Sequence, residues 1–430
     1  MRNRIENGEY NRRTSLGISL VIFNSFMVQY YVDIINSYVL YIVVLCGASL
    51  LLFSSNRKIL AIKVEYILLW YFAAIMMAIN LCRSDFDINT FADLATFITC
   101  VFMCSFINDK PNIFFKCFNI IDKFAVYYAF TIWIQILLPS IYKIYLDLMP
   151  ANIQVQILRQ QSSMAYTGFS SNLGFTAGHI VAGILLSATI LKKKDVGNTL
   201  KLMFLPFTLF LTGKRSTFAF LVVALIAIYL VSTIGIKKVT RLMIVAIIAV
   251  LISFVLMVFQ NQFSNIAVFS RIIETINGVM TGEDVSSSRS MIYLYAITLF
   301  QQSPIFGIGW GCFRKMTLGN ITWVNTVEVH NIYLQLLCET GIVGFIIMII
   351  PMVVSLIHSY KALRYELKNR SVTDYFNMLQ FAFAYQVFFL LYGLVENALY
   401  DYNFLIMYFL SCAIVIAYER YLRKGRIETI

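Results

Sequence analysis

The chain has 430 residues, of which 60% are hydrophobic and 13% are charged. Soluble proteins carry about a quarter charged residues, so this composition excludes a soluble enzyme and indicates a chain built for lipid. Of the eight cysteines, most lie in apolar runs and none has metal-ligand spacing with a histidine, which argues against a zinc site or a disulfide framework.

Apolar runs near the ~20 residues that cross a bilayer recur along the whole chain. The start, MRNRIENGEYNRR, precedes an apolar stretch from Leu16. No convincing small-residue cleavage site follows, so we expect a retained first helix rather than a signal peptide. Hydropathy predicts about twelve spans, at 16–32, 37–54, 63–82, 90–107, 118–138, 172–191, 199–212, 216–234, 240–260, 331–357, 375–396 and 402–421. The predicted fold is all-α, one polytopic integral membrane domain over residues 1–430.

Basic residues orient these spans. With the N-terminus in the cytoplasm, most of the 34 lysines and arginines fall in inner segments, as the positive-inside rule requires, and both termini are cytoplasmic. The basic residues left outside are Arg83, Lys143, Arg159, Lys214, Arg215, Arg271, Arg289, Arg314 and Lys315. Lys214 and Arg215 fill the tight turn LTGKRST between two helices. Because cations at membrane depth are costly, this pair indicates a functional site.

Two outer loops interrupt the pattern. The first, residues 139–171, is polar and mildly amphipathic, which is typical of a segment lying along the membrane surface. The second, residues 261–330, is the longest connection, and connections of this length are usually functional or disordered. Its segments RIIETINGVM and SRSMIYLYAITLF have helical apolar spacing, and GIGWG predicts a tight turn. We therefore expect an ordered, helical outer (periplasmic) loop.

Three outer arginines, Arg215, Arg271 and Arg289, lie close to predicted helix ends. A guanidinium binds phosphate oxygens through two parallel hydrogen bonds, so these residues indicate a site for a phosphate-bearing ligand. No acidic cluster with metal-binding spacing accompanies them. We therefore expect arginine rather than magnesium to neutralise a bound diphosphate, with no metal and no cofactor.

His330, at the junction of the large loop and the tenth span, faces the same compartment as the arginines. An imidazole there can act as a general base, although a lone histidine often only caps a helix or satisfies a core hydrogen bond. Glu339, nine residues later, would lie on the opposite face of a regular helix. The two would not form a simple acid–base pair unless the ETG at 339–341 breaks the helix; a packing glycine beside a hydrogen-bonded glutamate fits equally well.

Four ordered elements resemble a known family. The string SPIFGIGWGCF (303–313), followed by VHNIYLQLLCETGIVGF (329–345), resembles the C-terminal signature of the bacterial O-antigen polymerase and O-antigen ligase superfamily. The LTGKRS at 211–216 and the SSSRSMIY at 286–293 resemble the arginine-bearing elements that precede this signature. Order and spacing agree over roughly residues 205–345.

The resemblance implies a membrane glycosyltransferase whose donor is an undecaprenyl-diphosphate-linked glycan. Arg215 and Arg289, with Lys214 beside them, would bind the diphosphate, and His330 would activate the attacking sugar hydroxyl. Further candidate residues are Asn331, Tyr333 and Glu339 in supporting roles, and Arg271, whose spacing to Gly282 fits a polymerase loop pattern that Arg159 does not complete.

The function that this implies is an O-antigen or capsule polysaccharide polymerase, inverting and metal-independent. A ligase that transfers glycan to the lipid A core shares the same motifs, and a flippase or exporter of lipid-linked sugars would need basic residues lining the bundle. Expected partners are the lipid-linked oligosaccharide and membrane lipid, with a chain-length regulator as a further candidate and no nucleic acid. The expected location is the bacterial inner membrane, with the active site facing the periplasm.

Overall fold

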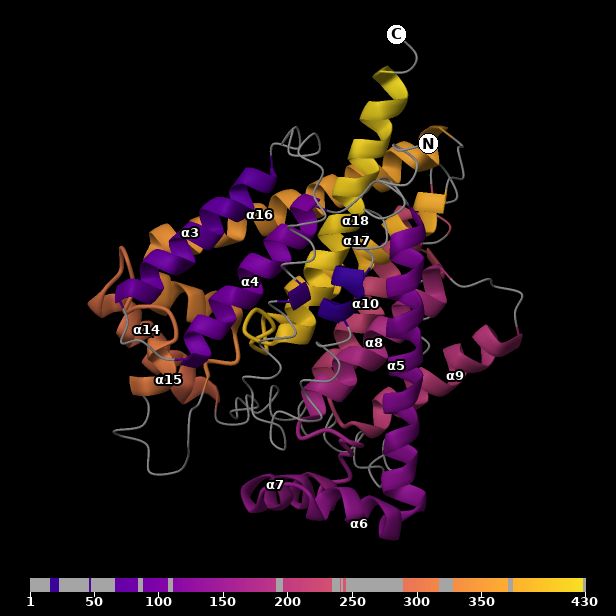
Figure 1. Ribbon diagram of the computed structural model, residues 1–430. Helices are drawn as coiled ribbons and strands as arrows, with labels where there is room; N and C mark the ends of the chain where they lie inside the picture. Colours follow the sequence, from indigo (N-terminus) through magenta and orange to yellow (C-terminus); the bar gives the residue numbers. More distant parts are fainter. Residues whose placement is uncertain are drawn as a thin grey trace.

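The computed structural model describes residues 16–22, 46–47, 66–83, 88–106, 111–190, 196–233, 240, 243–244, 289–316, 328–369 and 374–427. Within these ranges every regular element is a helix, which confirms the all-α class (Figure 1). Three of the described helices are long and apolar enough to cross a membrane, and shorter apolar helices accompany them. The count of about twelve spans is not confirmed, because the runs at 37–54 and 240–260 lie almost wholly outside the described residues.

The predicted spans from 63–82 to 216–234 correspond to described helices, most of which begin and end close to the predicted residues, because each apolar run is a local property of the chain. They are α3 (Ile67–Arg83), α4 (Ile88–Phe106), α5 (Pro111–Leu137), α8 (Leu173–Thr189), α9 (Val196–Leu211) and α10 (Arg215–Val231). α9 contains Pro206 and remains one helix. α5 begins earlier than predicted, at Pro111, a residue whose fixed φ and missing N–H suit the first position of a helix.

The C-terminal helices are α16 (Ile332–Asn369), α17 (Asp374–Tyr392) and α18 (Tyr402–Ile427). α18 lies at the centre of the described bundle, packed against α17, α4, α16 and α8 (Figure 1). Its apolar window is 89% buried, against 39% for those of α5 and α16, which leave much of their surface for lipid.

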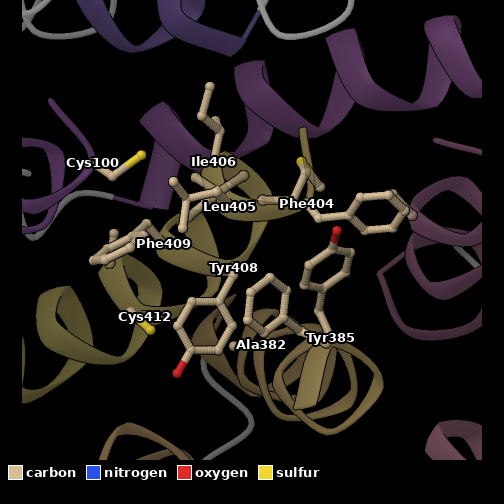
Figure 2. Packing of buried hydrophobic residues seen from close by; sticks show 14 of the residues in the cluster. Cys100, Ala382, Tyr385, Phe404, Leu405, Ile406, Tyr408, Phe409 and Cys412 are labelled. Carbon is tan, nitrogen blue, oxygen red and sulfur yellow. The ribbon is translucent and has the colours of Figure 1, made fainter. Parts of the chain in front are cut away.

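Aromatic side chains fill the contact between α17 and α18. Figure 2 shows Tyr408 of α18 close to Ala382 of α17, whereas Phe409 of α18 lies on the side of Cys100 of α4. The rings of Phe389 and Tyr408 stack with centroids 4.3 Å apart. Apolar burial does not drive association between helices in lipid, so close van der Waals packing of this kind holds the bundle together.

Four described helices lie outside the long spans: α6 (Pro139–Asp147), α7 (Ala151–Ser162), α14 (Arg289–Gln302) and α15 (Cys312–Met316). α14 confirms the helix expected from SRSMIYLYAITLF, whereas RIIETINGVM lies outside the described residues. The division of the chain into outer loops stays a prediction.

α16 is interrupted at Gly341, whose φ is 65° and ψ is −173°. The segment 304–309 pairs with the break through four backbone hydrogen bonds. They are Ile308 N to Cys338 O (2.9 Å), Gly309 N to Glu339 O (2.9 Å), Ile342 N to Pro304 O (2.9 Å) and Val343 N to Ile305 O (3.2 Å). Arg83 donates to Phe306 O at 2.7 Å and caps the same turn. An unpaired backbone group in lipid costs several kcal/mol, so this pairing is what permits a broken helix here.

Two glycines allow the segment 304–309 to lie against the break in α16. Gly307 and Gly341 both have positive φ, which favours glycine. A Cβ on Gly341 would stand 2.3 Å from Ile305 O, and a Cβ on Gly307 would stand 2.3 Å from Glu339 C. The P-x-x-G-x-G element and the E-x-G element of the sequence are therefore two halves of one backbone contact.

Candidate active site

His330 stands immediately before α16 in a left-handed backbone conformation, with φ of 56°. Such a conformation costs a non-glycine residue about 1–3 kcal/mol and persists only where the surroundings impose it. Asn331 supplies part of that restraint as the N-cap of α16, because its Oδ1 accepts from Tyr333 N at 3.0 Å and Leu334 N at 3.1 Å. Ile332 N donates to Gly393 O at 2.9 Å and ties the start of the helix to the end of α17.

The centre of the site is Glu396, in the segment 393–401 that joins α17 to α18. Its Oε2 lies 3.2 Å from Nδ1 of His330. Its Oε1 lies 2.8 Å from Nζ of Lys214 and 3.3 Å from Nη2 of Arg289. Arg289 also donates through Nη1 to the Val395 carbonyl. Four segments distant in the sequence therefore meet at one carboxylate.

This carboxylate is ionised at neutral pH. Burial alone would raise the pKa of Glu396, but the charge of Lys214, the hydrogen bond and charge of His330, and the charge of Arg289 together hold it well below its usual range. The Glu396 side chain is 11% exposed, so little water screens these interactions.

The ionised carboxylate sets the orientation of the imidazole. A carboxylate without a proton can only accept hydrogen bonds, so Nδ1 of His330 donates to Glu396, and in the neutral form of the imidazole Nε2 is the acceptor. The His330 side chain is 38% exposed, which leaves room for a ligand to reach it. This arrangement suits a general base held in one tautomer.

The cations around Glu396 can also bind an anionic ligand. An ammonium carries three N–H donors and a guanidinium carries five, more than one carboxylate oxygen can accept. Lys214 and Arg289 therefore offer donors toward phosphate oxygens while Glu396 holds them in position. Among the described residues, no group of three or more His, Cys, Asp or Glu side chains could hold a metal ion.

Glu339 belongs to a different contact. Its Oε2 accepts from the hydroxyl of Tyr400, and its Oε1 lies 3.3 Å from Phe313 N. Tyr400 stacks on Trp310 with ring centroids 4.8 Å apart. The hydrogen-bonded glutamate is thus part of the packing around the helix break, and it forms no acid–base pair with His330.

A second ionic network, centred on Arg314, contacts the segments next to the site. Arg314 lies 2.9 Å from Glu328 and 3.4 Å from Asp93 of α4. Glu328 also accepts from Asn397 Nδ2. Because Glu328 precedes His330 by two residues and Asn397 follows Glu396, this network fixes the two segments that carry the His330–Glu396 pair.

The structure brings Lys214, Arg289 and His330 together on Glu396. Of the set Arg215, Arg289 and His330 predicted from the sequence, this contact includes Arg289 and His330. Arg215 is the first residue of α10, next to Lys214, and is partly buried. Arg271 lies outside the described residues. Asn331 serves as the cap of α16, and the hydroxyl of Tyr333 donates to Leu390 O at 2.7 Å, so both hold the site in place.

Sequence reasoning missed Glu396, because hydropathy placed it inside the span predicted at 375–396. α17 ends at Tyr392, so Glu396 lies in the following loop. The available signal was a lone acidic residue at the end of an apolar run, a position where a charge is costly without a partner. Arg314 was noted only as one of the outer basic residues.

Residues 200–349 match the family model described as O-antigen ligase. The match includes Lys214, Arg215, Arg289 and His330 and ends before Glu396. A search among curated proteins finds no match. The match confirms the resemblance seen in the four sequence elements. Residues 200–349, about a third of the chain, are therefore similar to the O-antigen ligase and polymerase superfamily, whose members are membrane glycosyltransferase-like enzymes.

Proposed function

We propose that this protein is a polysaccharide polymerase of the O-antigen or capsule type. It transfers a glycan from undecaprenyl diphosphate to a sugar hydroxyl on an incoming lipid-linked repeat unit. The observation that carries the proposal is the convergence of His330, Lys214 and Arg289 on the buried carboxylate of Glu396. A base and two cations within one small site are what attack on a diphosphate-linked sugar requires.

In the proposed reaction the acceptor oxygen attacks the anomeric carbon of the donor and forms the new C–O bond. The bond from that carbon to the diphosphate oxygen breaks with inversion, and undecaprenyl diphosphate leaves with the electron pair. The acceptor proton passes to Nε2 of His330, and Glu396 stabilises the resulting imidazolium through Nδ1. Lys214, Arg289 and the neighbouring Arg215 bind the diphosphate and stabilise its developing charge.

The diphosphate is already a good leaving group, so most of the catalytic effect comes from position and electrostatics. The strained backbone of His330 and the network through Arg314 and Glu328 supply that position. We infer that the site faces the periplasm of a bacterial inner membrane, with both termini in the cytoplasm. A protein that regulates chain length is a candidate partner.

The test is elongation by the purified full-length chain in proteoliposomes supplied with lipid-linked repeat units. We expect a ladder of products, and we expect His330→Ala and Arg215→Ala to abolish it while membrane insertion stays normal. Full-length polymer made by either variant would overturn the proposed roles.

The second candidate is the ligase, because the family model that matches is described by that activity. A parallel reaction with lipid A core as the acceptor separates the two. Transfer of a finished glycan to the core without elongation identifies a ligase, whereas a ladder without core transfer identifies the polymerase. Movement of the labelled lipid-linked unit across the vesicle without either product would identify a flippase.

A further inference from the structure

The helices α6 and α7 each have three distinct faces. On α6, Tyr142 and Leu146 are buried. A second face carries the exposed apolar residues Ile141 and Ile144, continued by Leu148 at the C-terminal cap, at spacings of three and four, and Ile144 is 67% exposed. Between these faces the helix exposes Lys143 and other polar residues.

α7 repeats this arrangement. Ile157 is its buried residue. Val155 and Leu158 are exposed on one stripe, and Val155 is 66% exposed. Asn152, Gln156 and the basic Arg159 are exposed on the neighbouring stripe. Exposure of a continuous apolar stripe to water is unfavourable. The pattern therefore implies that one side of each helix faces water and another side faces an apolar environment.

The two helices form one unit with a defined position. Tyr142, Leu146 and Ile157 make a small core of their own, with Phe169 packed against it. The unit follows the membrane-crossing helix α5 and runs across its end (Figure 1). The exposed apolar surface is continuous in sequence with that of α5, since Phe130 and Leu137 near its end are also exposed.

We propose that α6 and α7 lie within the headgroup layer of the bilayer at the end of α5. Their apolar stripes enter the acyl region, and their polar stripes face water. The occupant of the apolar surface is membrane lipid. Three observations favour lipid: the continuity with α5, the crosswise orientation, and the basic residues Lys143 and Arg159 on the polar stripes, which attract anionic headgroups.

The unit is tied to the candidate active site through the segment that follows it. Tyr166 N donates to Leu211 O at 3.1 Å, and Gly168 N donates to Gln135 Oε1 at 2.8 Å. The chain then enters α8, where a Cβ on Gly174 would stand 3.6 Å from Nζ of Lys214. The segment that follows α6 and α7 therefore leads directly to the surroundings of Lys214. If the proposed function holds, a membrane-anchored diphosphate reaches Lys214 at headgroup level.

The test measures the surroundings of single side chains in the full-length protein in vesicles of phosphatidylethanolamine and phosphatidylglycerol. Cys46 and Cys82 are exposed and the other six cysteines are buried, so Cys46→Ser with Cys82→Ser gives a clean background. Nitroxide labels are then placed by Val155→Cys and Leu158→Cys on the apolar stripe. The matched controls are Asn152→Cys and Gln156→Cys on the polar stripe of the same helix.

The measured quantity is how often each of two reagents collides with the nitroxide. Oxygen concentrates in the acyl region, and a water-soluble nickel chelate stays in water. We expect the ratio of oxygen to nickel collisions to be high at Val155 and Leu158 and low at Asn152 and Gln156. Equal nickel access at all four positions would overturn the proposal by placing the helices in water. Protection of Val155 and Leu158 from both reagents would overturn it by showing that protein covers them. Neither readout depends on glycosyl transfer, so the result stands apart from the proposed function.

Discussion

The Nδ1 atom of His330 lies 3.2 Å from Oε2 of Glu396, and the other oxygen of that carboxylate lies 2.8 Å from the Lys214 ammonium. One side chain therefore joins the proposed base to a cation proposed for the diphosphate. Because each neighbour restrains Glu396 and is restrained by it, we expect the site to act as a unit rather than as independent residues.

Glu396→Gln keeps the shape of the side chain and removes its charge. The imidazole loses the acceptor that fixes its tautomer and stabilises the imidazolium, so we expect glycosyl transfer to fall on the order of 10²-fold or more. The double variant with His330→Ala should be no worse than His330→Ala alone, because residues that act as a unit have non-additive effects. The measurement is initial elongation rate at equal protein in vesicles.

The chain offers a matched control for this variant. His358 and Glu419 form another His–Glu pair, with Nδ1 and Oε1 2.6 Å apart. Glu419→Gln removes the same charge from the same kind of contact at a different place, and we expect activity near that of the wild type. Equal losses in both variants would mean that Glu396 acts on stability alone.

Arg289→Lys tests whether the guanidinium of Arg289, with its several N–H donors, binds the diphosphate. The substitution keeps the charge but cannot reach both the Glu396 carboxylate and the Val395 carbonyl as Arg289 does. Hydrogen bonds to charged groups contribute about 1.5–3 kcal/mol, so we expect the KM for the lipid-linked donor to rise roughly 10- to 100-fold. Arg159→Lys on α7 is the control. An unchanged KM in Arg289→Lys would remove Arg289 from diphosphate binding.

Gly341→Ala tests the break in α16. The new Cβ would sit 2.3 Å from Ile305 O at a backbone φ of 65°, so both the contact and the conformation oppose it. We expect a loss of at least about 1–3 kcal/mol in stability, seen as a lower midpoint of thermal unfolding in detergent. Gly307→Ala should behave alike, since it faces the same contact. Ile346→Ala, at an exposed position of the same helix, should leave the midpoint nearly unchanged.

The pH dependence of stability follows from Glu396. Its pKa is lower in the folded protein than in the unfolded chain, so its stabilising effect is complete above the unfolded value of about 4.3 and is lost as the pH falls through the folded value. At pH 7, Glu396→Gln should destabilise the protein on the order of 3–5 kcal/mol, because it leaves cations without their buried partner. Thermal unfolding of both proteins at pH 5 and pH 3, on either side of the unfolded value of the carboxyl, should show a smaller difference at pH 3. A difference that grows on acidification would contradict the assignment.

Chelation of divalent metal ions tests whether cationic side chains alone neutralise the bound diphosphate. Because Lys214 and Arg289 already present cationic donors at the site, we expect elongation to continue at an unchanged rate in excess EDTA. The rate with and without added magnesium, measured at constant ionic strength, provides the check. A loss of activity that magnesium restores would show that the cationic side chains do not suffice.

Several features of this protein follow from sequence alone. Apolar runs predict the helices closely, because the length and composition of a run are local properties. The spacing of P-x-x-G-x-G, E-x-G and the histidine indicates the family that residues 200–349 match, and the positive-inside rule predicts that His330, Lys214 and Arg289 lie on one side of the membrane. Each of these depends on residues near one another in the chain or on a simple count of charge.

Only the tertiary structure showed which side chains contact one another. Lys214 and Glu396 are 182 residues apart, and nothing local to either predicts their contact. Hydropathy averages over a window, so one glutamate in an apolar run was absorbed into a span. The role of Gly341 likewise depended on a segment more than thirty residues away in the chain that pairs with the break. His330 was identifiable from its motif, but its proposed chemistry depends on its contact with the carboxylate of Glu396. A buried charge needs partners of opposite charge, and only the fold brings those partners together.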